Sequence, residues 1–248
     1  MFEGDVLNPL SIAKESALLA GEFLSSDIQF NRKVCKEFAH DVKIAADIQS
    51  EKIILDHLME KSNFSILSEE KGMIERGIKD YFWIVDPVDG SLNYTRQIPF
   101  YCVSIGLWHG EKPVLGVVYD FNRAELFSGI ADNGAWLNEE RIHVSATNTK
   151  QNAVLFTGFP KQTDFSSQGI SDFVGCIQSY RKVRLLGSAA LSIAYVASGR
   201  GDAYYERDIM FWDIAGGIPL VLAAGGKVQI EKTSKANCLN IHITNGRI

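Results

Sequence analysis

The spacing of apolar residues changes at about residue 150, and this change limits the folds that the chain can adopt. From residue 64 to about 130, short β-rich runs alternate with turn residues, which is typical of a largely antiparallel sheet. Beyond 150, strand-like and helix-like segments alternate, which is typical of a sheet flanked by helices. We therefore expect a mixed α/β protein in which residues 1–150 contribute helices and antiparallel strands and residues 151–248 an alternating α/β half. No linker or repeat separates them, so residues 1–248 are expected to form one unit.

Local patterns place the elements within this frame. Small and apolar residues recur at helical spacing in 9–24 and 42–60, and the polar, basic stretch between these helices predicts an exposed loop or hairpin. Turn residues at 120–123 and the Asn133-Gly134 pair predict β-turns. In the second half, strands are predicted at 153–157, 182–186, 202–205, 227–231 and 239–243, and helices at 169–179, 188–198 and 213–224.

Composition excludes several classes of protein. The net charge is -5, and no block of basic residues would form a positive stripe along a phosphate backbone. Nucleic acid is therefore not an expected partner. The four cysteines lie far apart, which argues against a zinc site or a disulfide framework. No stretch reaches the roughly 18 apolar residues of a membrane span. We expect a cytoplasmic protein that does not enter a membrane.

An acidic motif follows a buried strand in the stretch IVDPVDGSLNY, residues 84–94. Pro87 biases Asp86 to an extended backbone and is expected to turn the chain, which would bring Asp89 back toward Asp86. Two carboxylates at the end of a buried strand repel each other unless a cation lies between them. The motif therefore indicates a cation site. The acids are three positions apart, which does not fit the alternate acids of an EF-hand loop.

The next residues of the motif suit a cation that carries phosphate. Val88 can turn its carbonyl toward the acids, and Gly90 allows a ligand to approach the backbone closely. Ser91 offers a hydroxyl and an amide N–H where a short helix can begin. On these residues alone, an ordinary turn with Ser91 as helix N-cap remains an alternative interpretation.

Two further acidic stretches favour the site over the turn. Glu69 and Glu70 follow an apolar strand in ILSEEKG, and Asp213 follows an aromatic pair in MFWDIAGG. Alone, the glutamates also suit a solvated loop, and Asp213 suits the first turn of a helix, where an acid interacts favourably with the helix dipole. Together with the first motif, the three stretches predict a site that gathers several carboxylates.

The stretches WIVDPVDGSLNY, SEEKG and GSAALSIAYVASGRGDAYYERDIMFWDIAGG resemble the inositol monophosphatase family of magnesium-dependent, lithium-sensitive phosphatases. The resemblance extends from about Lys36 to the last strands. It implies a layered αβαβα sandwich of the inositol monophosphatase and fructose bisphosphatase type, which would make the chain a single catalytic unit. It also implies two or three Mg²⁺ ions, a small phosphate ester as substrate and a homodimer.

The resemblance assigns metal ligands to particular positions. A first Mg²⁺ is implied at Glu69, Asp86 and the Val88 carbonyl. A second is implied at Asp86, Asp89 and Asp213, and a weaker third beside Glu69. Each of these groups is an oxygen donor, the type that Mg²⁺ prefers.

It also assigns positions for phosphate, water and substrate. Gly90 and Ser91 match phosphate-binding amides, and Asp47 matches an acid that pairs with the Ser91 hydroxyl to orient the attacking water, assisted by Glu69. The substrate contacts implied are Asp89, Gly90, Ser91, Gly187, Ser188, Ala189 and Glu206. A Gly-Ser pair before an apolar run is also an ordinary helix start, which leaves that interpretation open for two of them.

Two supporting residues and two departures complete the comparison. Glu70 matches a supporting acid, and Lys36 matches a basic residue of a mobile loop, although a plain surface lysine fits as well. Ser91 stands where the family usually has Thr, so the hydroxyl is kept and the methyl that restricts its rotamer is lost. Lys43 and Ile44 stand where an apolar residue and a Thr are common, which weakens the assignment of Asp47.

The expected reaction is in-line attack of a metal-activated water on a phosphate monoester, most simply inositol monophosphate, without a covalent phosphoenzyme. The same scaffold serves fructose-1,6-bisphosphatases, 3'(2'),5'-bisphosphate nucleotidases and histidinol phosphatases, and these activities remain alternatives. An alternative outside this class is a non-catalytic interaction protein that a metal cluster stabilises.

Overall fold

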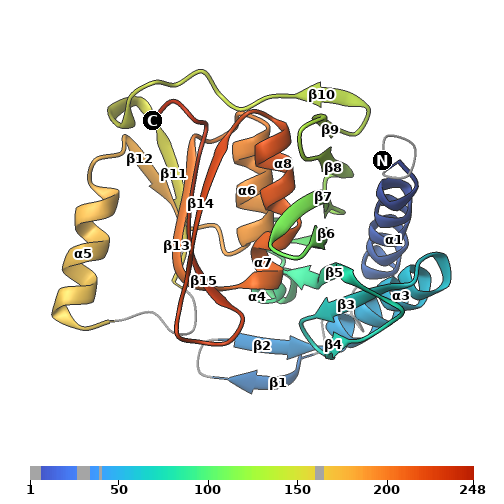
Figure 1. Cartoon of the computed structure of the whole chain (residues 1–248). Helices are drawn as coiled ribbons and strands as arrows, with labels where there is room; N and C mark the ends of the chain where they lie inside the picture. Colours follow the sequence, from blue (N-terminus) through green and yellow to red (C-terminus); the bar gives the residue numbers. More distant parts are fainter. Residues whose placement is uncertain (1–6, 27–33, 39–40, 160–164) are drawn as a thin grey trace.

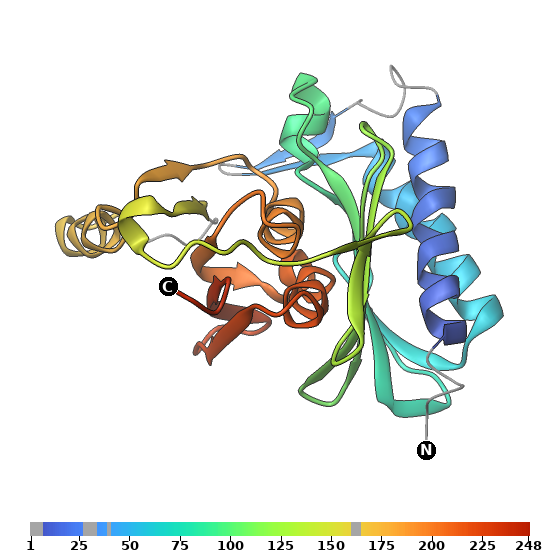
Figure 2. The same ribbon diagram turned by 90° about the horizontal axis from the view of Figure 1, so that it is seen from above.

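Helices and sheets alternate in five layers, as Figure 2 shows from above. The computed structural model describes residues 7–26, 34–38, 41–159 and 165–248. Helices α1 (Leu7–Ser25) and α3 (Ala45–Lys61) cover the outer face of an eight-stranded sheet (Figure 1). Its inner face packs on α6 (Ala189–Ala197), α7 (Phe211–Ala215) and α8 (Gly217–Ala223), followed by a five-stranded sheet and, outermost, α5 (Ser167–Ile177). The expected αβαβα architecture is confirmed.

The large sheet is antiparallel except where β3 runs parallel to β5, so the expectation of a largely antiparallel sheet is confirmed. Its order is β10-β9-β8-β7-β6-β5-β3-β4. The strands are β3 (Phe64–Ser68), β4 (Gly72–Ile74), β5 (Ile78–Asp89), β6 (Cys102–His109), β7 (Lys112–Asp120), β8 (Glu125–Ile130), β9 (Gly134–Leu137) and β10 (Glu140–Ile142). The predicted turn at 120–123 joins β7 to β8, while Gly134 is already the first residue of β9.

The small sheet is mixed, with β11 parallel to β12 and β13, and β15 antiparallel to β13 and β14. Its order is β12-β11-β13-β15-β14, so the alternating pattern of the second half does form a sheet flanked by helices. Its strands are β11 (Val154–Thr157), β12 (Lys182–Arg184), β13 (Ala203–Met210), β14 (Lys227–Lys232) and β15 (Cys238–Thr244), and a short 3-10 helix, η1 (Lys150–Asn152), precedes them.

Two predicted helices have different bounds in the structure. The helix expected at 42–60 begins only at Ala45, because Asp41–Ile44 form β2, which pairs with β1 (Val34–Phe38) as an antiparallel hairpin. The helix expected at 213–224 is two helices, α7 and α8, that meet at Gly216. A Cβ at Gly216 would lie 2.5 Å from Ser104 Oγ, so the large sheet leaves room only for bare backbone here.

Glycines bring the α7–α8 junction against the large sheet without intervening side chains. A Cβ at Gly116 would lie 1.9 Å from the Gly216 carbonyl oxygen, and one at Gly106 would lie 2.5 Å from the Ala215 carbonyl oxygen. Contacts below 3.0 Å require the backbone to shift, so β6 and β7 need glycine at these points. The contact fixes α7, which carries Asp213, against the sheet that carries the acidic motif.

Apolar side chains fill the space on both faces of the large sheet. Ile54 and Leu55 of α3 pack with Trp83 of β5, all fully buried, and a second cluster joins the sheet to α6 and α8. Burying one such side chain stabilises the fold by roughly 1.5–3 kcal/mol. In the described part of the chain, no helix has the length and apolar character that a bilayer crossing requires.

Candidate active site

A bulge in β5 places the acidic motif. We expected the chain to turn at Pro87, but β5 continues through Asp89, so that expectation is wrong. Asp86 pairs with Ser104 and Asp89 with Cys102, so three steps on β5 match two on β6. The extra residue is a β-bulge, which puts both carboxylates on the same face of the strand, where a regular strand would place them on opposite faces.

The carboxylate of Asp86 is the centre of the acidic cluster. Asp86 is 2 % exposed. The backbone N–H of Val88, two residues later, donates to Asp86 Oδ1 at 3.0 Å and orients the carboxylate. Burial raises the pKa of Asp86 well above its usual value. Four acids raise this pKa further by repulsion: Glu69, Asp89, Asp213 and Asp47. Three stretches that are remote in the sequence therefore meet the acidic motif here, and a cation would relieve their repulsion.

Asp89 binds the start of α6. Ser188 Oγ donates to Asp89 Oδ2 at 2.6 Å, and the Ala190 and Ala189 amides donate to its two oxygens at 2.7 and 3.3 Å. Burial raises the pKa of Asp89 to about 6, although these hydrogen bonds act in the opposite direction. The predicted metal ligand Asp89 and the predicted substrate loop at 187–189 are thus bonded directly to each other.

Ser188 is also the N-cap of α6, since its side chain accepts from the Leu191 N–H at 3.3 Å. The helix start that the sequence left open as an alternative is therefore real. The same hydroxyl serves both purposes, because it accepts from the helix and donates to Asp89. Helix entry and site geometry are not competing interpretations at this position.

Glycine is required on both sides of the contact between α4 (Ser91–Arg96) and the loop before α6. Gly90 has φ 92° and Gly187 φ 77°, both in the left-handed region. A Cβ at Gly90 would lie 3.1 Å from the Gly187 carbonyl oxygen. Asn93 joins the two segments, because its Nδ2 donates to Phe100 O at 2.8 Å and to Leu186 O at 2.6 Å. Sequence reasoning missed Asn93.

Helix α3 brings Asp47 to Ser91. The Ser91 hydroxyl lies 3.2 Å from Asp47 Oδ1 and 2.8 Å from the Val88 carbonyl oxygen. Three positions after Asp47, Ser50 donates to the Pro87 carbonyl oxygen at 3.1 Å and so fixes α3 against the bulge. The pairing that the resemblance implied for Asp47 and Ser91 is present as a hydrogen bond despite Lys43 and Ile44, while its role in orienting water remains a prediction.

The same face of α3 also holds the second acidic stretch. Glu51, four residues after Asp47 and 1 % exposed, accepts from the Glu70 and Lys71 amides at 3.1 Å each. The Glu69 N–H donates to the Val85 carbonyl oxygen at 3.2 Å, which ties the turn to β5. Sequence reasoning also missed Glu51, although its spacing of four from Asp47 on a predicted helix was a usable signal.

Glu206 lies buried on β13, 7 % exposed. The Tyr204 hydroxyl donates to its carboxylate, and Gly158 leaves room for it, since a Cβ there would lie 2.7 Å from Glu206 Oε2. Burial raises the pKa of Glu206 to about 7, the Tyr204 hydrogen bond lowers it, and the charge of Asp89 raises it. Glu206 therefore lies within electrostatic reach of the acidic site, on the opposite sheet from Asp86.

The remaining predicted residues are placed as follows. Asp213 is in the first turn of α7, Ala189 is the first residue of α6, and Glu70 is held in the turn after β3. Lys36 lies in β1, but its side chain is outside the described parts of the structure. The structure thus brings together acids from α3, the turn after β3, β5 and α7, while Lys36 is placed only by its backbone pairing with Lys43.

The donor set fits a hard divalent cation. It consists of carboxylates and a backbone carbonyl, which suit Mg²⁺ rather than a soft ion. Within the described ranges, no three Asp, Glu, His or Cys side chains form a cage tight enough to hold an ion as they stand. The carboxylates would have to move closer together to coordinate one ion.

Comparisons with known proteins agree with this geometry. The sequence model of the inositol monophosphatase family matches residues 7–241. An inositol-1-monophosphatase of Synechocystis sp. is 36 % identical over 247 residues, covering 98 % of this chain and 84 % of the relative. A Nus factor SuhB of Pasteurella multocida is 35 % identical over 232 residues, covering 90 % and 85 %. The solved inositol monophosphatase of Anabaena (Nostoc) sp. superposes with a TM-score of 0.85 at 37 % identity, covering 98 % of this chain and 92 % of that one.

The layered fold and the gathered acids define a phosphatase of the class that depends on divalent metals. The chain belongs to the inositol monophosphatase family.

Proposed function

We propose that this chain is a Mg²⁺-dependent phosphatase that hydrolyses inositol monophosphate, acting as a single catalytic unit. The observation that carries the proposal is the convergence of Glu69, Asp89, Asp213 and Asp47 on the buried carboxylate of Asp86. A buried group of like charges costs stability unless it binds cations, so a fold that keeps it has a use for the cations.

The metal ligands would come from both halves of the chain. Glu69, Asp86 and the Val88 carbonyl would hold one Mg²⁺, Asp86, Asp89 and Asp213 a second, and a weaker third would sit beside Glu69. When bound, such ions lower the pKa of water and stabilise negative charge on a phosphate ester.

The chain's own groups would position the reactants. Asp47 would accept a hydrogen bond from the Ser91 hydroxyl, which in turn would orient the attacking water, with Glu69 assisting. The Gly90 and Ser91 amides would hold the phosphate at the start of α4, where the left-handed backbone of Gly90 leads into the helix.

Substrate hydroxyls would meet the loop before α6 and the buried acid of β13. Gly187, Ser188 and Ala189 would contact the ring from one side and Glu206 from the other. Support comes from the direct hydrogen bonds between Asp89 and the residues at 188–190, which keep substrate loop and metal ligand in register.

The test is a substrate panel with Mg²⁺ and with excess chelator. Inositol 1-phosphate, fructose 1,6-bisphosphate, a 3',5'-bisphosphonucleotide and histidinol phosphate would be compared by phosphate release. Inositol phosphate should give the highest kcat/KM, and chelation should abolish turnover. Faster turnover of another ester would reassign the substrate, while cation-dependent melting without any turnover would indicate a non-catalytic protein.

Three further properties belong to the proposal: a homodimer, inhibition by lithium and a cytoplasmic location. For the dimer, support comes from exposed apolar side chains near α5, where Phe165, Val174 and Leu185 are 59 %, 47 % and 51 % exposed and no residue of the helix is buried. Sedimentation would test the dimer, a lithium titration the inhibition, and cell fractionation the location.

A further inference from the structure

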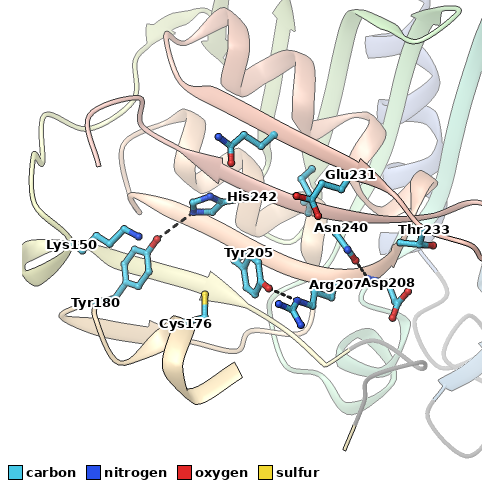
Figure 3. A pocket seen from close by; sticks show the side chains of 12 residues that line it. Lys150, Cys176, Tyr180, Tyr205, Arg207, Asp208, Glu231, Thr233, Asn240 and His242 are labelled. Atoms are coloured by element: carbon cyan, nitrogen blue, oxygen red, sulfur yellow. Dashed lines mark hydrogen bonds between the residues drawn. The ribbon is translucent and has the colours of Figure 1, made fainter. Parts of the chain in front are cut away.

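A cavity of about 540 Å³ lies outside the candidate active site, on the outer face of the small sheet, on the side away from the large sheet (Figure 3). Its walls come from η1, α5, β13, β14 and β15. Tyr205 of β13 lines it, while the neighbouring Glu206 is buried among Tyr204 and Gly158. Side chains alternate between the faces of a strand, so this cavity and the candidate active site lie on opposite faces of β13.

Two cations, Lys150 and Arg207, line this cavity. Among the described residues, neither Lys150 nor Arg207 has an acid within ion-pair distance. Arg207 Nε donates to the Tyr205 hydroxyl at 2.5 Å, and the Lys150 amine lies 5.3 Å from the centre of the Tyr180 ring. The hydrogen bond to Tyr205 is the main cause that raises the pKa of Arg207, and the charge of Asp172 raises it further, while the Asp172 carboxylate accepts a hydrogen bond from Gln168.

The positive charges of Lys150 and Arg207 both act on the thiol of Cys176, which also lines the cavity. Burial raises the pKa of Cys176, and Lys150 and Arg207 both lower it, so the two positive charges act on the same place. His242 adds no charge there, because burial and the nearby Lys150 lower its pKa. Its Nε2 lies 3.4 Å from the Tyr180 hydroxyl. An anion placed beside Cys176 would meet two cations and two phenol hydroxyls.

The other end of the cavity carries uncharged amides and an acid. Gln229 and Glu231 of β14 lie beside Asn240 of β15, and Asn240 Oδ1 already accepts from the Asp208 amide at 3.0 Å. The acid Asp208 is neutralised by Lys235 at 3.0 Å, which leaves Glu231 as the acid without an ion pair in the described part of this wall. Amides can donate to and accept from hydroxyls, and a carboxylate accepts from them, so this end suits the hydroxyl groups of a ligand.

We propose that this cavity binds a small phosphorylated polyol, with the phosphate between Lys150 and Arg207 and the hydroxyl groups toward Gln229, Asn240 and Glu231. The cavity volume is within the range of about 300–1,000 Å³ that small-molecule sites occupy. Arg207 offers a planar fork of donors to the phosphate, and Lys150 offers a compact point charge. The inference goes beyond the proposed function, because it needs neither the acidic cluster nor a metal ion.

The experiment is calorimetric titration of the full chain with sorbitol 6-phosphate in excess chelator. Without divalent ions the acidic cluster repels phosphate, so binding reports the outer cavity alone. Saturable binding is expected, and Arg207→Gln and Lys150→Gln should each weaken it at least tenfold. The remote exposed Arg141→Gln should bind as the unchanged protein does. Sorbitol and inorganic phosphate, titrated alone, should each bind at least tenfold more weakly.

A second readout locates the ligand. Sorbitol 6-phosphate should slow alkylation of Cys176 by iodoacetamide, measured by peptide mapping, and Arg207→Gln should abolish that protection. Absence of saturable binding, binding that both cavity variants retain, or saturable binding that leaves Cys176 unprotected would each overturn the proposal. Equal affinity for inorganic phosphate would show an anion site without polyol recognition and overturn the ligand class. None of these outcomes depends on phosphatase activity.

Discussion

Ser188 Oγ donates a 2.6 Å hydrogen bond to Asp89 Oδ2, and the two residues are 99 positions apart in the chain. The bond joins β5 of the large sheet to the first turn of α6, between the sheets. Together with the Ala189 and Ala190 amides, this hydroxyl connects the acidic motif of the first half to the glycine-serine motif of the second. It brings two patterns that are distant in the sequence into direct contact.

Replacing this serine tests the connection. Ser188→Ala should lower the free energy of unfolding by about 2–3 kcal/mol, because it removes a hydrogen bond to a carboxylate and a helix N-cap. Urea unfolding would measure the change. Ser192→Ala is the matched control, since Ser192 donates only to the Ser188 carbonyl oxygen within the same helix. A loss in the control as large as in Ser188→Ala would show that α6 tolerates no such truncation and that the Asp89 contact is not special.

Removing one acid from the cluster should separate activity from stability. Asp86→Asn or Asp213→Asn is expected to abolish Mg²⁺-dependent phosphate release. Without metal, the melting temperature should stay the same or rise, because one source of repulsion on the cluster is gone. Phosphate release and thermal melting in chelator would measure the two effects. Asp132→Asn, in the turn before β9, is the control for loss of a remote carboxylate, and normal turnover by either site variant would refute the metal assignment.

The hydroxyl at position 91 should act on rate rather than on binding. Ser91→Ala removes the partner of Asp47 and the Val88 carbonyl, and kcat should fall by about 100-fold with KM changed much less. Steady-state kinetics at saturating Mg²⁺ would measure both constants. Ser91→Thr keeps the hydroxyl and should retain most of the rate. An equal effect of Ser91→Ala on kcat and KM would instead make the residue a binding group.

Glu51 should support the metal site without touching a metal. Its carboxylate holds the amides of Glu70 and Lys71, so Glu51→Ala frees the turn that carries Glu69. The Mg²⁺ concentration at half-maximal rate should rise by roughly 10–100-fold, as for other residues that orient metal ligands. Glu51→Gln keeps an acceptor oxygen and should show a smaller shift. If both variants lose kcat at saturating Mg²⁺ with unchanged metal affinity, the positioning role is wrong.

Burial of Glu206 predicts a dependence of stability on pH. Its pKa is raised from 4.5 to about 7, so the folded state binds its proton more tightly than the unfolded state does. Stability is therefore highest below the unfolded value and falls as the pH rises from about 4.5 to 7, by about 3 kcal/mol from this group. Unfolding in chelator between pH 4.5 and 8 would show a smaller decline for Glu206→Gln. An equal decline in both proteins would contradict the shift.

Sequence patterns predicted the layers and most elements, because alternating and helical spacings report burial on one face. They failed where long-range contacts decide the local backbone. Ala45 begins α3 because the preceding residues pair with β1, and Gly216 separates α7 from α8 because the large sheet touches it. Residues 86–89 predict a turn but form a bulge, since Pro87 suits both and only pairing with β6 distinguishes them.

The residues of the candidate site likewise fall into those that the sequence predicts and those that only the structure reveals. Acids such as Asp86 and Asp213 stand out because they follow apolar runs, where a carboxylate has few ordinary uses. Glu51 and Asn93 do not stand out, because a glutamate within a helix and an asparagine in a short helical turn are common on surfaces. Their roles come from carbonyls and amides that the fold brings to them, as in the Asn93 contacts to Phe100 and Leu186.

The glycine-lined contact of β6 and β7 with the α7–α8 junction has a consequence for motion. Backbone touches backbone at this junction, so α7 and α8 cannot slide along β6 and β7 there without a clash of backbone atoms. Capture and release of ions must then come from rotation of carboxylates and movement of short surface segments, rather than from opening and closing of whole lobes. We therefore expect small local rearrangements near the acidic cluster, and not motion of whole layers, to limit the rate of turnover.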